Sequence, residues 1–250
     1  MKPTMHQLTR HFLLLLTVSA LVAGCAPNVP LQSQQSMQES GQKQHTLPES
    51  RYLQAEAQGK NILRVDSAKS LVAFEVRRDG PFAKLGHDHV VASHDVKGFV
   101  APDENTADLQ VRMDQLVVDE APLRAEAGFD TQPTADDIAG TRRNMLLHVL
   151  EAERYPYAAI HIERKDANSK AAKQSGKAIL DVAITLHGTT KHFDVPATVE
   201  TTAAGMIVSG SMHFNQTDFG MTPYSILNGA IRVADRLDMR FHVVAEKRES

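Results

Sequence analysis

Two histidines separated by one residue form the stretch of this sequence best suited to chemistry. His87 and His89 flank Asp88, and residues two apart lie on the same face of an extended strand. Two imidazoles on one face can bind zinc, copper or nickel if a third ligand is available. Polar residues that could supply it are His94, His213 and Asp218.

A structural role for the two histidines is nevertheless favoured over a metal site. Histidine side chains commonly hydrogen-bond to backbone groups or to a bound ligand. Under that interpretation His87 and His89 are ligand-binding residues. A divalent metal bound by the pair is the alternative, and a catalytic base is the least favoured role.

The usual signatures of enzymes are missing from the sequence. There is no Gly-x-Ser-x-Gly elbow, no His-Glu-x-x-His helix and no phosphate-binding glycine loop. Cys25 is the single cysteine, so neither an intrachain disulfide nor a thiolate cluster can form. We therefore predict no enzyme and no catalytic residue.

Charge and composition argue against nucleic-acid binding. The 250 residues carry a net charge of -3, and tryptophan is absent. Binding to DNA or RNA needs a basic face or stacking aromatic side chains. The hydrophobic and charged fractions, 42% and 23%, are instead those of an ordinary globular domain.

The N-terminus has the pattern of a secretory signal. A basic start with Lys2 and Arg10 precedes the apolar segment Phe12–Leu21, which is too short to remain as a transmembrane helix. Val22–Cys25 resembles the lipobox of bacterial lipoproteins, which implies removal of residues 1–24 and acylation of Cys25. Acyl chains would anchor the protein to a membrane. Ala26 favours the outer membrane, facing the periplasm, in a Gram-negative host.

Residues 25–60 are predicted to be the acylated cysteine and a flexible tether. The segment is rich in glutamine and serine and shows no sustained periodicity, a composition that does not bury enough apolar surface to fold. Only a short helix within residues 48–58 is compatible with its pattern. The folded domain is predicted to occupy residues 61–250.

Alternating apolar residues dominate that domain. Residues 178–186 and 193–199 alternate around a short break at His187 and Gly188, which predicts two antiparallel strands. The same period of two recurs and predicts about eight strands. Residues 134–156 have helical spacing instead, with Thr134 as an expected cap. The domain is thus mainly β with one helix, arranged as a barrel or a sandwich.

The order of these parts resembles the YceI-like family over residues 62–247. The motifs that carry the resemblance are Asp66–Val76, Gly98-Phe99, Tyr155-Pro156, Leu186–Lys191 and Asp218–Met221. It implies an antiparallel, eight-stranded lipocalin-like β-barrel that holds a polyisoprenoid or quinone-like chain. Two departures are the second histidine beside Asp88 and the lipid anchor, since family proteins are usually soluble in the periplasm.

Ligand-binding residues are expected among inward-facing side chains of the barrel. The predicted lining is Phe74, Val76, Phe82, Leu85, His87, His89, Phe99, Val111, Met113, Leu180, Val182, Ile184, Phe193, Met212, Phe214, Phe219, Met239 and Phe241. The expected partners are an isoprenoid or related lipid and the membrane, and a homodimer is left open. No cofactor is expected beyond that lipid or the alternative metal. A barrel filled by its own side chains is the third hypothesis.

Overall fold

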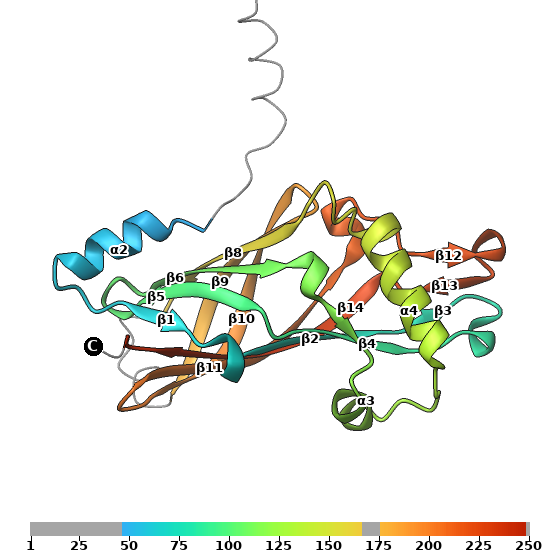
Figure 1. Ribbon diagram of the computed structural model, residues 1–250, viewed down its shortest axis with the longest axis horizontal. Helices are drawn as coiled ribbons and strands as arrows, with labels where there is room; N and C mark the ends of the chain where they lie inside the picture. The colour runs from blue at the N-terminus through green and yellow to red at the C-terminus, as the bar shows by residue number, and fades with distance from the viewer. Residues whose placement is uncertain (1–46, 167–175, 249–250) are drawn as a thin grey trace, which may run out of the picture. The chain divides into compact units, whose positions relative to one another are not determined.

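A closed antiparallel β-barrel forms the core of the computed structural model, which describes residues 47–166 and 176–248 (Figure 1). Cys25 and the predicted signal segment lie outside the described residues. Eight barrel strands can be followed in the described part, two of them interrupted by a bend. They are β1 (Leu63–Val65) with β2 (Leu71–Val76), β4 (His89–Ser93) with β5 (Val96–Ala101), β6 (Thr106–Arg112), β8 (Tyr157–Arg164), β9 (Lys177–Leu186), β10 (Thr189–Thr201), β11 (Gly205–Asn215) and β14 (Arg236–Glu246).

The barrel closes between its first and last strands. One edge of β14 pairs with β11 along its whole length, and the other edge pairs first with β2 and then with β1. The bend between β1 and β2 is fixed by Ser70, whose hydroxyl donates to the carbonyl of Asp66 at 2.7 Å. Closure pairs the strand edges that would otherwise be open to aggregation.

The predicted hairpin of β9 and β10 is confirmed. Leu180, Val182 and Ile184 are buried, and each pairs with a residue of β10 in an antiparallel register. His187 and Gly188 both have positive φ, 50° and 75°, as a two-residue turn of the hairpin type requires. The ring of Tyr155 covers this turn, 4.4 Å from the His187 ring between centroids.

The predicted helix is also confirmed, but it is shorter than expected. Helix α4 spans Ala135–Asn144 and continues as a π-helical turn over Met145–Val149, not to residue 156. Thr134 caps it as predicted, because its hydroxyl accepts from the Asp137 amide and the Asp137 carboxylate accepts in return. Ile138 and Met145 pack on the barrel core.

Two further helices and a small sheet complete the described part. Helix α3 (Ala121–Ala127) follows β7 (Val117–Val118), a short strand that pairs with β4. Strands β3 (Arg78–Asp79), β13 (Ile231–Val233) and β12 (Ser225–Ile226) form a separate three-stranded sheet beyond the end of the barrel that α4 covers (Figure 1). No helix among the described residues is long and apolar enough to cross a membrane.

Helix α2 corrects the predicted extent of the tether. It spans Glu49–Ala57 and packs on the outside of β5. Tyr52 is 1% exposed, its ring stacks on Phe99 at 5.0 Å, and its hydroxyl donates to Asp108 at 2.7 Å. The segment from Leu47 to residue 60 therefore belongs to the folded unit. Leu47 and Ala55 pack beside Tyr52, and ion pairs from Arg51 to Glu104 and from Glu56 to Arg64 add to the attachment. The polar composition concealed these contacts.

Removing one hydroxyl tests how α2 is held. Tyr52→Phe keeps the stack on Phe99 but removes the hydrogen bond to Asp108. Because the acceptor is charged, we expect a loss of about 1–2 kcal/mol in unfolding free energy, measured by urea denaturation. Leu53→Ala on the exposed face of α2 is the control and should change stability by less than about 0.5 kcal/mol. Equal effects of the two variants would contradict this account.

Candidate functional site

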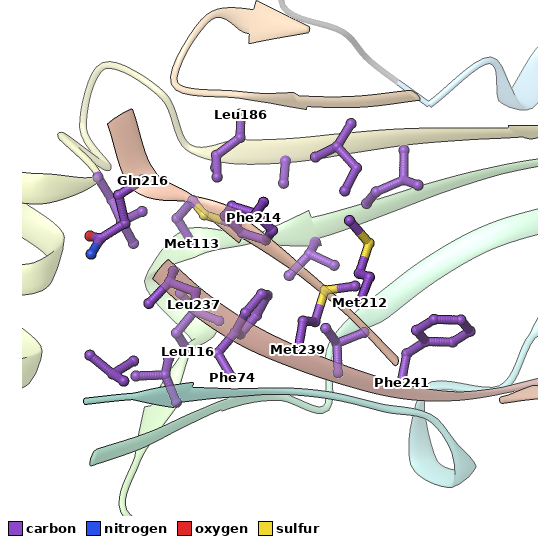
Figure 2. A pocket seen from close by; sticks show the side chains of 18 of the residues that line it. Phe74, Met113, Leu116, Leu186, Met212, Phe214, Gln216, Leu237, Met239 and Phe241 are labelled. Atoms are coloured by element: carbon purple, nitrogen blue, oxygen red, sulfur yellow. The ribbon is translucent and has the colours of Figure 1, made fainter. Parts of the chain in front are cut away.

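The barrel encloses an elongated apolar cavity of about 680 Å³. Its wall is built from inward-facing aliphatic, aromatic and methionine side chains of all eight barrel strands. Figure 2 shows Met212 and Met239 facing each other across neighbouring strands, with Phe74, Phe214 and Phe241 around them. Because strand residues alternate between faces, each strand contributes every second residue to this wall.

Most of the predicted lining residues do reach the cavity. The structure places these on its wall: Phe74, Val76, Leu85, His87, His89, Val111, Met113, Leu180, Val182, Ile184, Met212, Phe214, Met239 and Phe241. The wall also contains residues absent from the predicted set. Val208, Leu237 and Val243 continue the same alternation and could have been included from the sequence. Thr141, Asn144 and Met145 reach it from α4, which strand periodicity does not address.

Four predicted aromatic residues lie elsewhere. Phe82 is 55% exposed, and Phe99 is buried outside the barrel against Tyr52. Phe193 and Phe219 are absent from the cavity wall and pack against Phe214, at centroid distances of 6.3 and 5.2 Å. The prediction was therefore wrong for these four residues. Phe82 lies outside any strand. For the others, alternation along the sequence does not show whether a buried side chain faces the cavity or another part of the chain.

A buried polar group lies at the end of the cavity beneath α4. His89 donates from Nδ1 to Asp119 Oδ2 at 2.6 Å, and its Nε2 lies 3.2 Å from Thr141 Oγ1. This order of carboxylate, imidazole and hydroxyl also occurs in hydrolase triads, but here it joins α4 to β4. With Nδ1 protonated, a neutral ring accepts the Thr141 hydroxyl proton at Nε2.

Asp119 is the centre of this polar group. Its carboxylate is fully buried and also accepts from the Val90 amide at 2.9 Å and from Arg124 at 2.6 Å. Burial favours the neutral acid, but the hydrogen bonds from His89, the Val90 amide and Arg124 outweigh it, so the pKa of Asp119 is lowered. Asp119 therefore stays ionised and fixes the orientation of the His89 ring.

His87 remains available to a ligand. It lines the cavity and contacts the His89 ring edge-on, 6.1 Å between centroids, and it makes no hydrogen bond to any described residue. Asp88 points away and accepts from the Arg78 amide at 2.8 Å. The wall is thus mostly apolar, and the polar side chains on it include His87 as well as Arg78, Asp136 and Asp137. Such a site can hold an amphiphile with an apolar chain and a polar head.

The metal alternative is not supported. No group of three or more potential ligands was found among the described residues, and both nitrogens of His89 already have partners. Two of the three proposed third ligands are used elsewhere: His94 pairs with Glu120 at 2.8 Å, and Asp218 accepts from the Asn215 amide.

Comparison with solved structures identifies the same fold. A polyisoprenoid-binding domain from Saccharophagus degradans, implicated in plant cell wall breakdown, matches with a TM-score of 0.52 and 12% identity, over 74% of this chain and 98% of that one. BcnA of Burkholderia cenocepacia matches at 0.49 and 16% identity, over 73% and 99%. A YceI protein of Campylobacter jejuni matches at 0.39 and 15%, over 62% and 82%. Only the first of these structures has a TM-score above 0.5. Because its sequence identity is low, the likeness concerns the fold alone.

A search of curated proteins gave no match to this sequence. The sequence model of the YceI-like domain, in contrast, matches residues 63–245. These residues run from the first strand of the barrel, β1, into the last, β14, and include the whole cavity wall between them. The chain therefore belongs to the YceI-like domain family.

Proposed function

We propose that this protein binds a long apolar amphiphile, such as a polyisoprenoid or a quinone-like lipid, in the barrel cavity. The observation that carries this proposal is the cavity itself. Its volume of about 680 Å³ lies within the range of ligand-binding pockets, roughly 300–1,000 Å³. A barrel filled by its own side chains, the third hypothesis above, would leave no such space.

The apolar wall accounts for the expected affinity. Each Å² of apolar ligand surface removed from water contributes about 25 cal/mol, so an isoprenoid chain gains affinity with each unit that enters. Methionines add adaptability, because Met113, Met212 and Met239 are unbranched and can adjust to a ligand. We therefore expect the affinity for an apolar chain to depend more on the length of the chain than on its exact shape.

The polar residues at the α4 end of the cavity could bind the head group of the ligand. His87 and Asn144 line the cavity there and make no side-chain hydrogen bond to a described residue. An imidazole and an amide can donate to and accept from a hydroxyl or carbonyl oxygen. We expect an alcohol or quinone head group to lie against these two residues. The description of the Saccharophagus degradans domain as polyisoprenoid binding agrees with this class of ligand.

Membrane anchoring is part of the same proposal. The sequence Val22–Cys25 supports acylation of Cys25 after removal of residues 1–24. An anchored binding protein would work beside the bilayer in which such amphiphiles reside. Labelling with radioactive palmitate should mark the wild-type chain and leave Cys25→Ala unlabelled; incorporation into both would refute the assignment.

Ligand titration tests the binding proposal. The full chain is mixed with isoprenoid alcohols of increasing length, and complexes are counted by native mass spectrometry. We expect one ligand per chain and an affinity that increases with length until the cavity is full. The matched straight-chain alkanols distinguish an isoprenoid preference from general apolar binding. Failure of every isoprenoid to bind would overturn the proposal.

A further inference from the structure

Exposed apolar side chains gather on the small sheet beyond the barrel. Phe82, Leu85, Ile226 and Leu227 are 55%, 71%, 46% and 66% exposed. They come from two segments far apart in the sequence, the turn Ala83–Leu85 with the residue before it and the β12–β13 hairpin. The segments are joined directly, because the Phe82 amide donates to the carbonyl of Ala230 at 2.9 Å. We call these four residues the mouth rim.

The mouth rim is continuous with the cavity. Leu85 and Ile226 belong to the cavity wall as well as to the exposed surface, and the half-buried Ile231 of β13 also lines the cavity. His87, the proposed contact for a head group, follows Leu85 by two residues. Apolar side chains therefore run from solvent into the cavity at this end, beside the charged side chains of Arg78 and Arg232, which also line it.

The backbone at Leu227 is not explained by folding alone. Leu227 has φ 52° and Asn228 has φ 55°, both in the left-handed region. Asparagine tolerates this region, but leucine rarely adopts it. Strained residues of this kind concentrate at functional sites. An exposed leucine held there at a hairpin tip projects an apolar side chain at a cost that glycine or asparagine would avoid.

A basic residue accompanies the apolar ones. Lys84 lies between Phe82 and Leu85, is exposed, and makes no ion pair with any described residue. Basic side chains beside apolar ones are typical of surfaces that enter the interface of a bilayer with anionic lipids. Apolar side chains together with a lysine, placed beside a cavity of lipid size, therefore favour a bilayer over a protein partner.

We propose that the mouth rim docks on an anionic lipid bilayer, so that the ligand passes between the membrane and the cavity without crossing water. This inference rests on the proposed function and names the source of its ligand. Phe82 and Leu227 would enter the acyl boundary while Lys84 contacts phosphate groups. Leu85 and Ile226, which line the cavity, then face the lipid chains.

The predicted anchor is compatible with this orientation. Helix α2 lies at the end of the barrel away from β12 and β13 (Figure 1). Residues 26–46 separate Cys25 from the described part, and a chain of that length can reach at most about 70 Å. Strand β14, Arg236–Glu246, runs about 37 Å along the barrel, and the small sheet lies beyond its end (Figure 1). The mouth rim can therefore meet the bilayer that holds the anchor.

Because the chain has no tryptophan, one introduced tryptophan reports its own environment. Phe82→Trp in the full chain is mixed with phosphatidylethanolamine–phosphatidylglycerol vesicles that contain brominated lipids. We expect a blue shift of emission and quenching by bromine. Leu53→Trp on α2, 40% exposed at the other end of the barrel, is the control and should stay unquenched. Equal quenching at both positions, or at neither, would overturn the docking surface.

A second variant tests transfer. Phe82→Ser with Leu227→Asn removes the apolar side chains, keeps a residue that tolerates the left-handed backbone, and changes no residue of the cavity wall. Uptake of a fluorescent isoprenoid from vesicles should slow at least tenfold, with unchanged affinity for the same probe delivered from solution. An unchanged uptake rate would refute docking and leave the rim to a protein partner. Absence of binding in the wild type would instead refute the proposed function.

Discussion

Replacing Met212 with aspartate should weaken isoprenoid binding at least 100-fold. Met212 lies on the cavity wall opposite Met239 (Figure 2), so the new carboxylate would contact the ligand chain. Burying an uncompensated charge against an apolar chain costs several kcal/mol, and each 1.4 kcal/mol is a factor of about ten in affinity. The dissociation constant measured by fluorescence titration gives the result directly.

The matched control lies one residue away on the same strand. Ser211 is exposed on the outer face of β11 and pairs in register with Arg240, so Ser211→Asp adds the same charge outside the barrel. It should bind as the wild type does. Circular dichroism and a melting temperature establish that Met212→Asp is folded. A folded Met212→Asp variant with wild-type affinity would show that the ligand does not lie in the cavity.

Replacing Asp119 with alanine should destabilise the protein by about 3–5 kcal/mol, the usual effect of breaking a buried ion pair. The variant would remove the acceptor of the Val90 amide and of Nδ1 of His89, and one acceptor of Arg124, which still donates to the carbonyls of Asp88 and Thr131. Denaturation in guanidinium chloride measures the loss. Asp119→Asn keeps an oxygen acceptor and tolerates the positive φ of 60° at this position, and should lose less. Loss of less than about 1 kcal/mol in Asp119→Ala would contradict the central role of this carboxylate.

Lowering the pH should destabilise the folded protein, because it protonates the carboxylate of Asp119. The pKa of Asp119 is lowered in the folded protein from its ordinary value of 3.8, so the unfolded chain binds the proton more readily. The stabilisation by the ionised group is complete above pH 3.8 and is lost as the pH falls through the lower, folded pKa. Unfolding free energy measured against pH should therefore fall less steeply below pH 4 in Asp119→Asn than in the wild type. Parallel curves would contradict the lowered pKa.

The strands of the barrel could be predicted because their signal is local. Each inward residue of β9 or β14 repeats every second position, and one buried face is enough to fix that pattern. Closure could not be derived from periodicity, since it depends on β14 pairing with both β1 and β2 across most of the chain. The closed barrel was predicted from the family resemblance, and the pairing of β14 with β1 and β2 shows how it closes.

The candidate site was predictable only where strands build it. His89 was singled out from its spacing to His87, but its partner Asp119 lies 30 residues away in a turn with no motif. Thr141 meets it from a helix whose packing cannot be read from strand alternation. These long-range contacts favour a fixed imidazole over a metal ligand at His89. Phe82, predicted inside the barrel, instead contributes to the mouth rim.

Native mass spectrometry of the mature protein, extracted from its host in a mild detergent that is removed in the gas phase, tests the central claim most directly. The account predicts a complex of one protein with one lipid, and dissociation in the gas phase should release a molecule that fragments as an isoprenoid. Met212→Asp prepared in the same way should carry none. Wild-type protein that is empty, and that stays empty after incubation with the isoprenoids of its own host, would contradict the proposal that this barrel is an amphiphile-binding site.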